Sequence, residues 1–145
     1  MDGKVDTNLY SRQIGTFGME TMGKLIKMKI LIYGLRGLGV ETAKNTILAG
    51  PHEVQLCDKE LVSINDLAGN FYLTEADVGK KRRDEACVSQ LAELNPYVHV
   101  SVMQGTLLEN VTKFKVIVIT EVMNKEELIE IDTLCRKNKI AFIYT

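Results

Sequence analysis

The chain has 145 residues, 46% of them hydrophobic, and its 18 Lys and Arg nearly balance 19 Asp and Glu, for a net charge of −1. This length and apolar content are enough for one globular domain of ordinary size. The near-neutral charge argues against a nucleic-acid-binding protein, since such proteins carry a basic excess. The apolar runs are too short to span a bilayer, and the charged start, residues 1–4, is unlike a secretory signal. We therefore expect no nucleic-acid partner and no membrane association.

The three cysteines, Cys57, Cys87 and Cys135, are an odd number without a C-x-x-C pair. This pattern argues against a disulfide framework or a zinc site and favours a reducing compartment. Cys57 falls in a predicted strand and the other two lie on predicted helix faces, so we expect small buried apolar residues rather than nucleophiles. His52 is expected to be exposed, and neither it nor His99 has a ligand set around it, so no metal site is predicted.

The first 27 residues are predicted to form an N-terminal helical segment. Helical spacing extends over residues 9–25, and Asn8 can cap the first turn through its side-chain oxygen. Glycine lowers helix propensity, so we expect two short helices with a break between them. Three glycines interrupt the spacing: Gly15, Gly18 and Gly23.

Strands and helices alternate over residues 28–145. The expected strands are residues 28–33, 53–58, 98–103, 116–120 and 140–144, and the expected helices are residues 40–48, 80–94 and 128–135, with an irregular stretch at 63–77. This alternation predicts right-handed βαβ units and hence an α/β fold, a Rossmann-like parallel sheet with helices on both faces. The last strand has no following helix to cover it, so we expect the chain to be a fragment of a longer one.

A glycine-rich turn follows the first predicted strand and leads into a helix: Gly34-Leu35-Arg36-Gly37-Leu38-Gly39. Nucleotide-binding Rossmann folds place their phosphate-binding turn here, and an acidic residue such as Asp58 at the end of the next strand binds the ribose. Arg36 replaces the middle glycine, which normally lets the backbone approach the phosphates. Two interpretations follow: Gly34 and Gly39 serve tight packing only, or the turn still binds a nucleotide.

Two other features have an ordinary and a functional interpretation. The charge run at residues 80–83 is followed at once by Asp84 and Glu85, so we expect the solvated first turn of a helix rather than a site for acidic groups. Phe71 and Tyr72 are expected to be core or domain-interface anchors rather than a platform for a ligand.

Several segments closely resemble the N-terminal part of eukaryotic ubiquitin-activating enzymes, in their first, inactive adenylation half; these belong to a ThiF/MoeB-like superfamily. The resemblance covers residues 9–145. The segments that carry it are Leu9-Tyr10-Ser11-Arg12-Gln13, the glycine turn with Val40-Glu41-Thr42-Ala43-Lys44-Asn45, Phe71-Tyr72-Leu73, Asp77-Val78-Gly79-Lys80 and Leu91-Ala92-Glu93-Leu94-Asn95.

The resemblance implies one half of a two-half enzyme. In that family two related adenylation domains pair about a pseudo-two-fold axis, and only the active half uses ATP and Mg²⁺ to adenylate the ubiquitin C-terminus. A cysteine in another domain then takes ubiquitin as a thioester and passes it to a conjugating enzyme. The implied partners are the active half, ubiquitin and conjugating enzymes, the implied location is cytoplasmic and nuclear, and the isolated fragment is expected to self-pair.

The resemblance also implies that this half has lost its own ATP site. Arg36 replaces the middle glycine of the active half's turn. Residues 66–71 lack the asparagine and arginine that contact ATP in the active half. Arg82 occupies the place of the catalytic lysine, and Glu121 is a poor substitute for the magnesium-binding aspartate. We therefore expect no cofactor in the degenerate pocket, where Gly34, Gly37, Gly39 and Asp58 are vestigial; Asp58 and Glu60 keep only the charge of the active half's acidic pair.

Arg12 is the one catalytic residue that the resemblance implies. In the family this arginine reaches the ATP site of the active half and neutralises phosphate charge. The alternative is a surface arginine paired with Glu20. Other classes remain open for the chain as a whole: the inactive subunit of a SUMO-activating enzyme, a small sulfur-carrier adenylating enzyme, or a dinucleotide-binding oxidoreductase domain.

Overall fold

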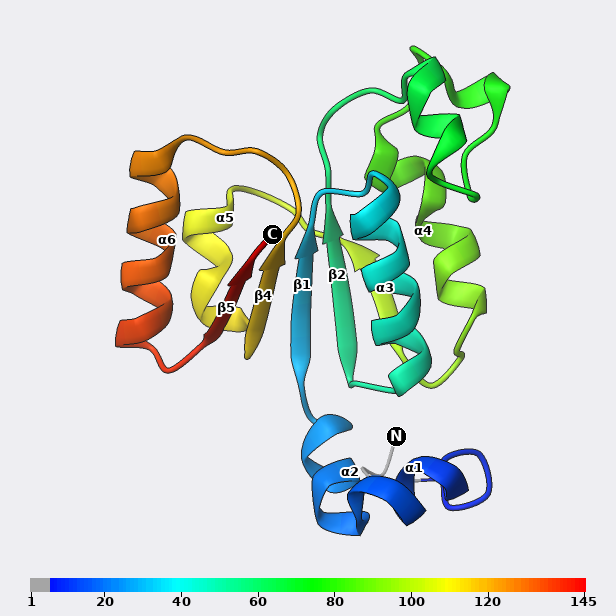
Figure 1. The fold of residues 1–145 in the computed structure, drawn as a ribbon, viewed down its shortest axis with the longest axis vertical. Helices are drawn as coiled ribbons and strands as arrows, with labels where there is room; N and C mark the ends of the chain where they lie inside the picture. Colours follow the sequence, from blue (N-terminus) through cyan, green and yellow to red (C-terminus); the bar gives the residue numbers. More distant parts are fainter. Residues whose placement is uncertain (1–5) are drawn as a thin grey trace.

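Five parallel strands form the centre of the structure (Figure 1). The computed structural model describes residues 6–145; residues 1–5, where the predicted N-terminal segment begins, lie outside the described part. The strands are β1 (Lys29–Tyr33), β2 (Glu53–Cys57), β3 (His99–Val102), β4 (Val116–Ile119) and β5 (Ala141–Tyr144). They are hydrogen-bonded in the order β3-β2-β1-β4-β5, and each neighbouring pair is parallel. The predicted α/β fold is confirmed.

Helices cover both faces of this sheet (Figure 1). Helices α3 (Gly37–Ala49) and α4 (Arg83–Glu93) lie on one face. Helices α5 (Leu107–Asn110) and α6 (Lys125–Lys137), with the short helix η3 (Val111–Lys113), lie on the other. The sequence pattern did not predict α5 and η3, and α3 begins at Gly37, inside the glycine turn rather than after it.

The alternation of side chains along β1 divides the core into two layers. Ile30 and Ile32 pack with α3 and α4, whereas Leu31 packs with the layer under α5 and α6. Because a strand sends successive side chains to opposite faces, an apolar run such as residues 30–32 is buried on both sides. The sheet therefore packs against an apolar core on each face, and these two cores fix the position of the carboxyl ends of its strands.

The N-terminal segment forms two short helices, α1 (Ser11–Phe17) and α2 (Met19–Leu25), with the predicted break at Gly18. They lie beyond the amino ends of the strands, at the bottom of Figure 1. The predicted cap at Asn8 is wrong: the Asp6 carboxylate accepts the backbone N–H groups of Asn8 and Leu9 instead. Helix α1 itself begins after Tyr10, which makes no side-chain cap hydrogen bond, so Asp6 stabilises the turn that precedes the helix.

Residues 63–77 are more regular than their composition predicts. They contain two short 3₁₀ helices, η1 (Ile64–Ala68) and η2 (Glu75–Asp77). In each, a Ser or Thr and an acidic residue three positions later exchange hydrogen bonds with the backbone. This capping box fixes the connection that leads from β2 to α4 over the carboxyl edge of the sheet.

Candidate functional site at the carboxyl edge of the sheet

The strand order reverses beside β1, whose neighbours β2 and β4 lead the chain to opposite sides of the sheet. In open α/β sheets, ligands bind outside the carboxyl ends of the strands at such a switch point. Gly34 follows β1, Asp58 follows β2, and Thr120 and Glu121 follow β4. The predicted glycine turn and Asp58 are therefore brought together at the expected place.

Gly34 and Gly39 are both required by close packing within the turn. Gly34 has a left-handed backbone, with φ of +92°, and a Cβ on it would lie 2.7 Å from Oγ1 of Thr120. A Cβ on Gly39 would collide with the carbonyl oxygen of Gly34. Only glycine fits either position. This geometry supports the structural interpretation of these two glycines.

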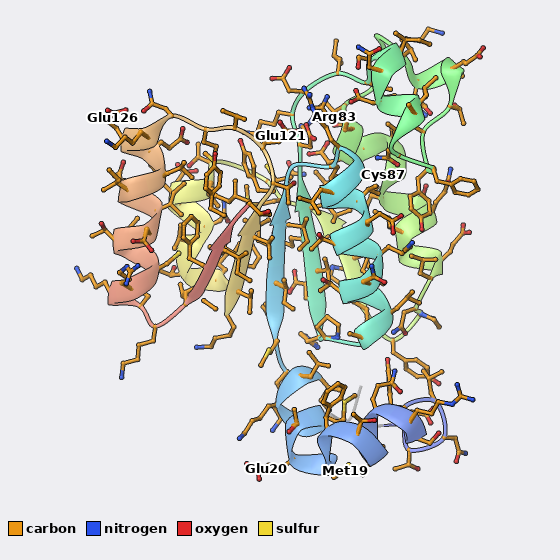
Figure 2. All side chains as sticks on the ribbon, in the orientation of Figure 1. Met19, Glu20, Arg83, Cys87, Glu121 and Glu126 are labelled. Atoms are coloured by element: carbon orange, nitrogen blue, oxygen red, sulfur yellow. The ribbon has the colours of Figure 1, made fainter. Side chains whose placement is uncertain are left out.

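Arg83 occupies the centre of the site, where the sequence pattern did not predict a functional residue. Its side chain is 2% exposed, and Nε donates to Oδ2 of Asp58 at 2.7 Å. Nη1 donates to Oδ2 of Asp66 at 3.1 Å, and Nη2 lies 3.5 Å from Oε1 of Glu121. Figure 2 shows Arg83 and Glu121 converging above the ends of β1 and β2. Burial lowers the pKa of Arg83, but pairing with Asp58 and Asp66 outweighs it and raises that pKa, so the guanidinium stays charged.

The predicted solvated turn at residues 80–83 is therefore only partly right. Lys80 and Lys81 are exposed, and Arg82 is partly exposed, but Arg83 and Asp84 are buried. Arg82 pairs with Asp84 at 2.5 Å and with Glu85 at 3.6 Å. Arg83, not Arg82, is the cation that reaches the site. Helix α4 begins at Arg83, three residues later than the spacing predicts, and Arg83 is buried at its first position.

Asp58 is committed to contacts within the protein. Oδ2 also accepts the backbone N–H of Leu35 at 2.7 Å, and Oδ1 accepts that of Glu60 at 3.2 Å. The residue is 3% exposed. A ribose could reach this carboxylate only by displacing Arg83 or one of the backbone donors.

The glycine turn is also covered from above. The side-chain amide of Asn70 donates to the carbonyl of Leu35 at 2.8 Å and is buried. A Cβ on Gly37 would lie 3.4 Å from the carbonyl oxygen of Gly69, so the two backbones are in close contact. Arg36 is the N-cap residue of α3, and its guanidinium turns to Glu121, with Nε 3.1 Å from Oε1. The connection after η1 therefore lies against the space that phosphates take in nucleotide-binding turns.

A cleft of about 270 Å³ remains beside this network. Its charged lining consists of four carboxylates and one lysine: Asp58, Glu60, Glu121, Glu127 and Lys59. A triphosphate needs cationic or N–H donor surroundings. The acidic lining, the paired Asp58 and the covered turn are unlike such surroundings. Residues 6–145 also contain no group of three or more His, Cys, Asp or Glu side chains that could hold a metal ion.

Arg12 lies on α1, at the opposite end of the sheet from the glycine turn (Figure 1). Its side chain is exposed, and Glu20, the alternative partner considered from the sequence, pairs with Lys24 at 2.7 Å instead. The structure does not bring Arg12 together with Gly34 or Asp58. If Arg12 contacts a bound phosphate, another domain must bind that phosphate.

The same N-terminal segment is anchored by Tyr10, which is 4% exposed. Its hydroxyl accepts a hydrogen bond from the amide of Asn95 at 2.9 Å, and the Asn95 amide also donates to the carbonyl of Ile47 at 3.0 Å. Gly50, with φ of +87°, lies directly against the Tyr10 ring. Two of the segments singled out in the sequence, residues 9–13 and 91–95, thus meet in one contact.

The cysteines and histidines take the predicted places. Cys57, Cys87 and Cys135 are free and buried. Burial raises the pKa of the Cys57 thiol to about 11 and that of Cys87 to about 12, so neither is a thiolate at neutral pH. His52 and His99 are exposed. Phe71 is 91% exposed. The predicted role as a core residue is therefore wrong, and the role as a domain-interface anchor stays a prediction.

No helix within residues 6–145 has both the length and the apolar character to cross a membrane.

The chain belongs to the ThiF family, whose sequence profile matches residues 10–144. Among curated proteins it is 45% identical over 143 residues to ubiquitin-activating enzyme E1 2 of Arabidopsis thaliana, covering 97% of this chain and 13% of that protein. It is 40% identical over 143 residues to ubiquitin-like modifier-activating enzyme 1 of Homo sapiens, covering 98% of this chain and 13% of that protein. The chain thus spans about an eighth of the length of these relatives. The sequence resemblance to ubiquitin-activating enzymes is confirmed.

Solved structures support the fold at low sequence identity. Escherichia coli tRNA N6-threonylcarbamoyladenosine dehydratase has a TM-score of 0.77 at 17% identity, covering 95% of this chain and 59% of that one. Further structures of that dehydratase contain AMP or ATP. E. coli MccB has a TM-score of 0.78 at 19% identity, covering 99% of this chain and 45% of that one. These likenesses establish a shared α/β fold.

Proposed function

We propose that this chain is the inactive adenylation half of a ubiquitin-activating enzyme. In this proposal it supports ATP-dependent adenylation of the ubiquitin C-terminus by the active half, before thioester formation and transfer to a conjugating enzyme. The identity of 40–45% to segments of ubiquitin-activating enzymes favours this over a sulfur-carrier enzyme or an oxidoreductase. The inactive subunit of a SUMO-activating enzyme remains the alternative.

The observation that carries the inactive assignment is the buried contact between Arg83 and Asp58. Adenylation places negative charge on the α-phosphate, and cationic groups and Mg²⁺ must meet it. Here the buried guanidinium of Arg83 is already neutralised by Asp58 and Asp66, and that of Arg36 pairs with Glu121. ATP and Mg²⁺ are therefore proposed cofactors of the full-length enzyme, bound in the active half and not in this pocket.

Arg12 is proposed to complete the ATP site of the active half. Its exposure on α1, far from its own glycine turn, agrees with a role in a neighbouring domain. A planar guanidinium can bind two phosphate oxygens at once. The proposed N-terminal segment, residues 1–27, would then present a catalytic side chain, and residues 28–145 would supply the Rossmann-like support.

The surface that meets the active half is proposed to include the exposed apolar side chains near the carboxyl edge. Phe71 is 91% exposed, Val122 92% and Ile64 63%. Large apolar side chains left in solvent are typical of an interface. The isolated chain is expected to self-pair through this surface, because related halves pack about a two-fold axis. The proposed location is cytoplasmic and nuclear.

Ubiquitin-driven ATP–pyrophosphate exchange by the full-length enzyme tests this function. Arginine fingers are worth roughly 10³-fold or more in phosphoryl transfer. Since Mg²⁺ and a lysine share the charge here, Arg12→Ala is expected to slow exchange by about 10- to 100-fold, or about 1.4 to 2.7 kcal/mol. Arg12→Lys should recover part of the rate, because an ammonium lacks the planar fork.

Two controls separate a catalytic from a structural effect. The melting temperature should barely change, since an exposed arginine contributes at most about 1 kcal/mol. Thr21→Ala, at an exposed position of the adjacent helix α2, should leave exchange unchanged. Unchanged exchange in Arg12→Ala would contradict the proposal. Exchange driven by SUMO but not by ubiquitin would favour the alternative.

A further inference from the structure

An apolar groove ringed by lysines lies at the amino edge of the sheet, at the opposite end from the glycine turn. Met28, Val116 and Ala141 line its floor. Its rim consists of four lysines: Lys24, Lys27, Lys115 and Lys139. Its volume is about 510 Å³. We call this feature the amino-edge groove; none of its residues takes part in the site described above.

The rim concentrates positive charge on a chain whose net charge is −1. Lys24 pairs with Glu20, but Lys27, Lys115 and Lys139 form no ion pair with any carboxylate of residues 6–145. Lys115 directly precedes β4, and Lys139 lies two residues before β5. Because β4 and β5 are adjacent strands, the topology holds both cations at the same end of the sheet. Like charges gathered in this way attract an anionic partner.

Lys139 also has a strained backbone. Its φ of +56° makes it the one non-glycine residue with positive φ within residues 6–145. It follows Asn138, the C-cap of α6, at a position where helices commonly place glycine. A left-handed conformation costs a side chain free energy, and such strain is concentrated at ligand clamps and other functional sites. The backbone N–H of Ile140 donates to the carbonyl of Cys135, so this turn closes the end of α6 and places Lys139 at the rim of the groove.

We propose that the amino-edge groove binds an acidic, amphipathic segment of a partner protein. Apolar side chains of that segment would fill the floor over Val116 and Ala141, and its carboxylates would pair with the rim lysines. The groove has a volume of about 510 Å³, which leaves room for inserted side chains. It has no aromatic side chain on which a nucleobase could stack, so a nucleic acid fits less well. This proposal does not depend on the proposed function.

The test uses the 145-residue chain and a fluorescein-labelled synthetic helical peptide with leucines on one face and glutamates beside them. Fluorescence polarisation should show saturable binding that a glutamine-substituted peptide lacks. Lys115→Glu should weaken binding about tenfold. Lys125→Glu, at the other end of α6 and outside the groove, should leave it unchanged.

Lys139→Gly separates binding from folding. Loss of one exposed charge pair should weaken peptide binding by about two- to fivefold. The same variant should raise the melting temperature by roughly 2–4 °C, because glycine accepts the left-handed backbone. Equal weakening by Lys125→Glu, or no loss in Lys115→Glu, would overturn the proposal. Binding of phosphatidylserine vesicles in place of the peptide, lost in Lys115→Glu, would overturn it in favour of a membrane surface.

Discussion

Arg83 and Asp58, 25 residues apart in the sequence, form an ion pair in which both side chains are 2% exposed, with Nε 2.7 Å from Oδ2. The pair joins the start of α4 to the end of β2 at the switch point of the sheet. It places a cation of this chain beside the carboxylate that would otherwise bind a ribose.

This pair predicts an unequal effect of two arginine substitutions. Arg83→Met should lower the free energy of unfolding by about 3–5 kcal/mol, because it leaves buried Asp58 and Asp66 without their counter-charge. Arg36→Met, which removes a mostly exposed pairing with Glu121, should cost about 0–1 kcal/mol. Urea unfolding followed by circular dichroism measures both. Similar losses in the two variants would contradict a central structural role for Arg83.

The burial of Arg83 also shows where sequence reasoning stops. The sheet and its main helices follow from apolar periodicity, which is local. A run of four cations followed by two acids has the pattern of a solvated helix start, and only the tertiary fold brings Arg83 to Asp58, Asp66 and Glu121, 17 to 38 residues away.

The capping boxes mark short helices that the apolar pattern did not predict. Thr106 and Glu109 begin α5 with the spacing of a capping box, as Ser63 and Asp66 begin η1. This local signal was available in the sequence and could have located both elements. The inward turn of Arg83 had no comparable local signal.

Two glycine substitutions test how the N-terminal segment is anchored. Gly50→Ala should destabilise the fold by more than about 1 kcal/mol, since its φ is +87° and the new Cβ would strike the Tyr10 ring. Gly15→Ala, inside α1 with no atom within 4 Å of the new Cβ, should stabilise the chain by about 0.5–1 kcal/mol. Thermal unfolding of both variants decides it. A neutral Gly50→Ala would show that the Tyr10 contact is loose.

Asp77 predicts a loss of stability at acidic pH. Hydrogen bonds from Lys81 and Thr74 lower the pKa of Asp77 from 3.8 to about 2. Because the folded-state pKa is the lower one, the stabilisation is fully present above the unfolded-state value and is lost as pH falls from about 4 towards 2. Asp77→Asn should flatten this part of the curve of unfolding free energy against pH. Glu130→Gln, on the exposed face of α6, is the matched control and should leave it unchanged.

The last prediction concerns ATP itself. The chain should bind Mg-ATP weakly or not at all, with full-length ubiquitin-activating enzyme as the positive control in calorimetry. A low-micromolar dissociation constant requires about −8 kcal/mol, whereas the carboxyl edge has a paired Asp58, a covered turn and an acidic cleft. Arg36→Gly restores the missing glycine of the turn but leaves Arg83 on Asp58, so it should not restore tight binding. Low-micromolar binding by the unmodified chain would contradict the proposed loss of its ATP site. Tight binding by Arg36→Gly alone would show that Arg36, and not the contact between Arg83 and Asp58, keeps the nucleotide out.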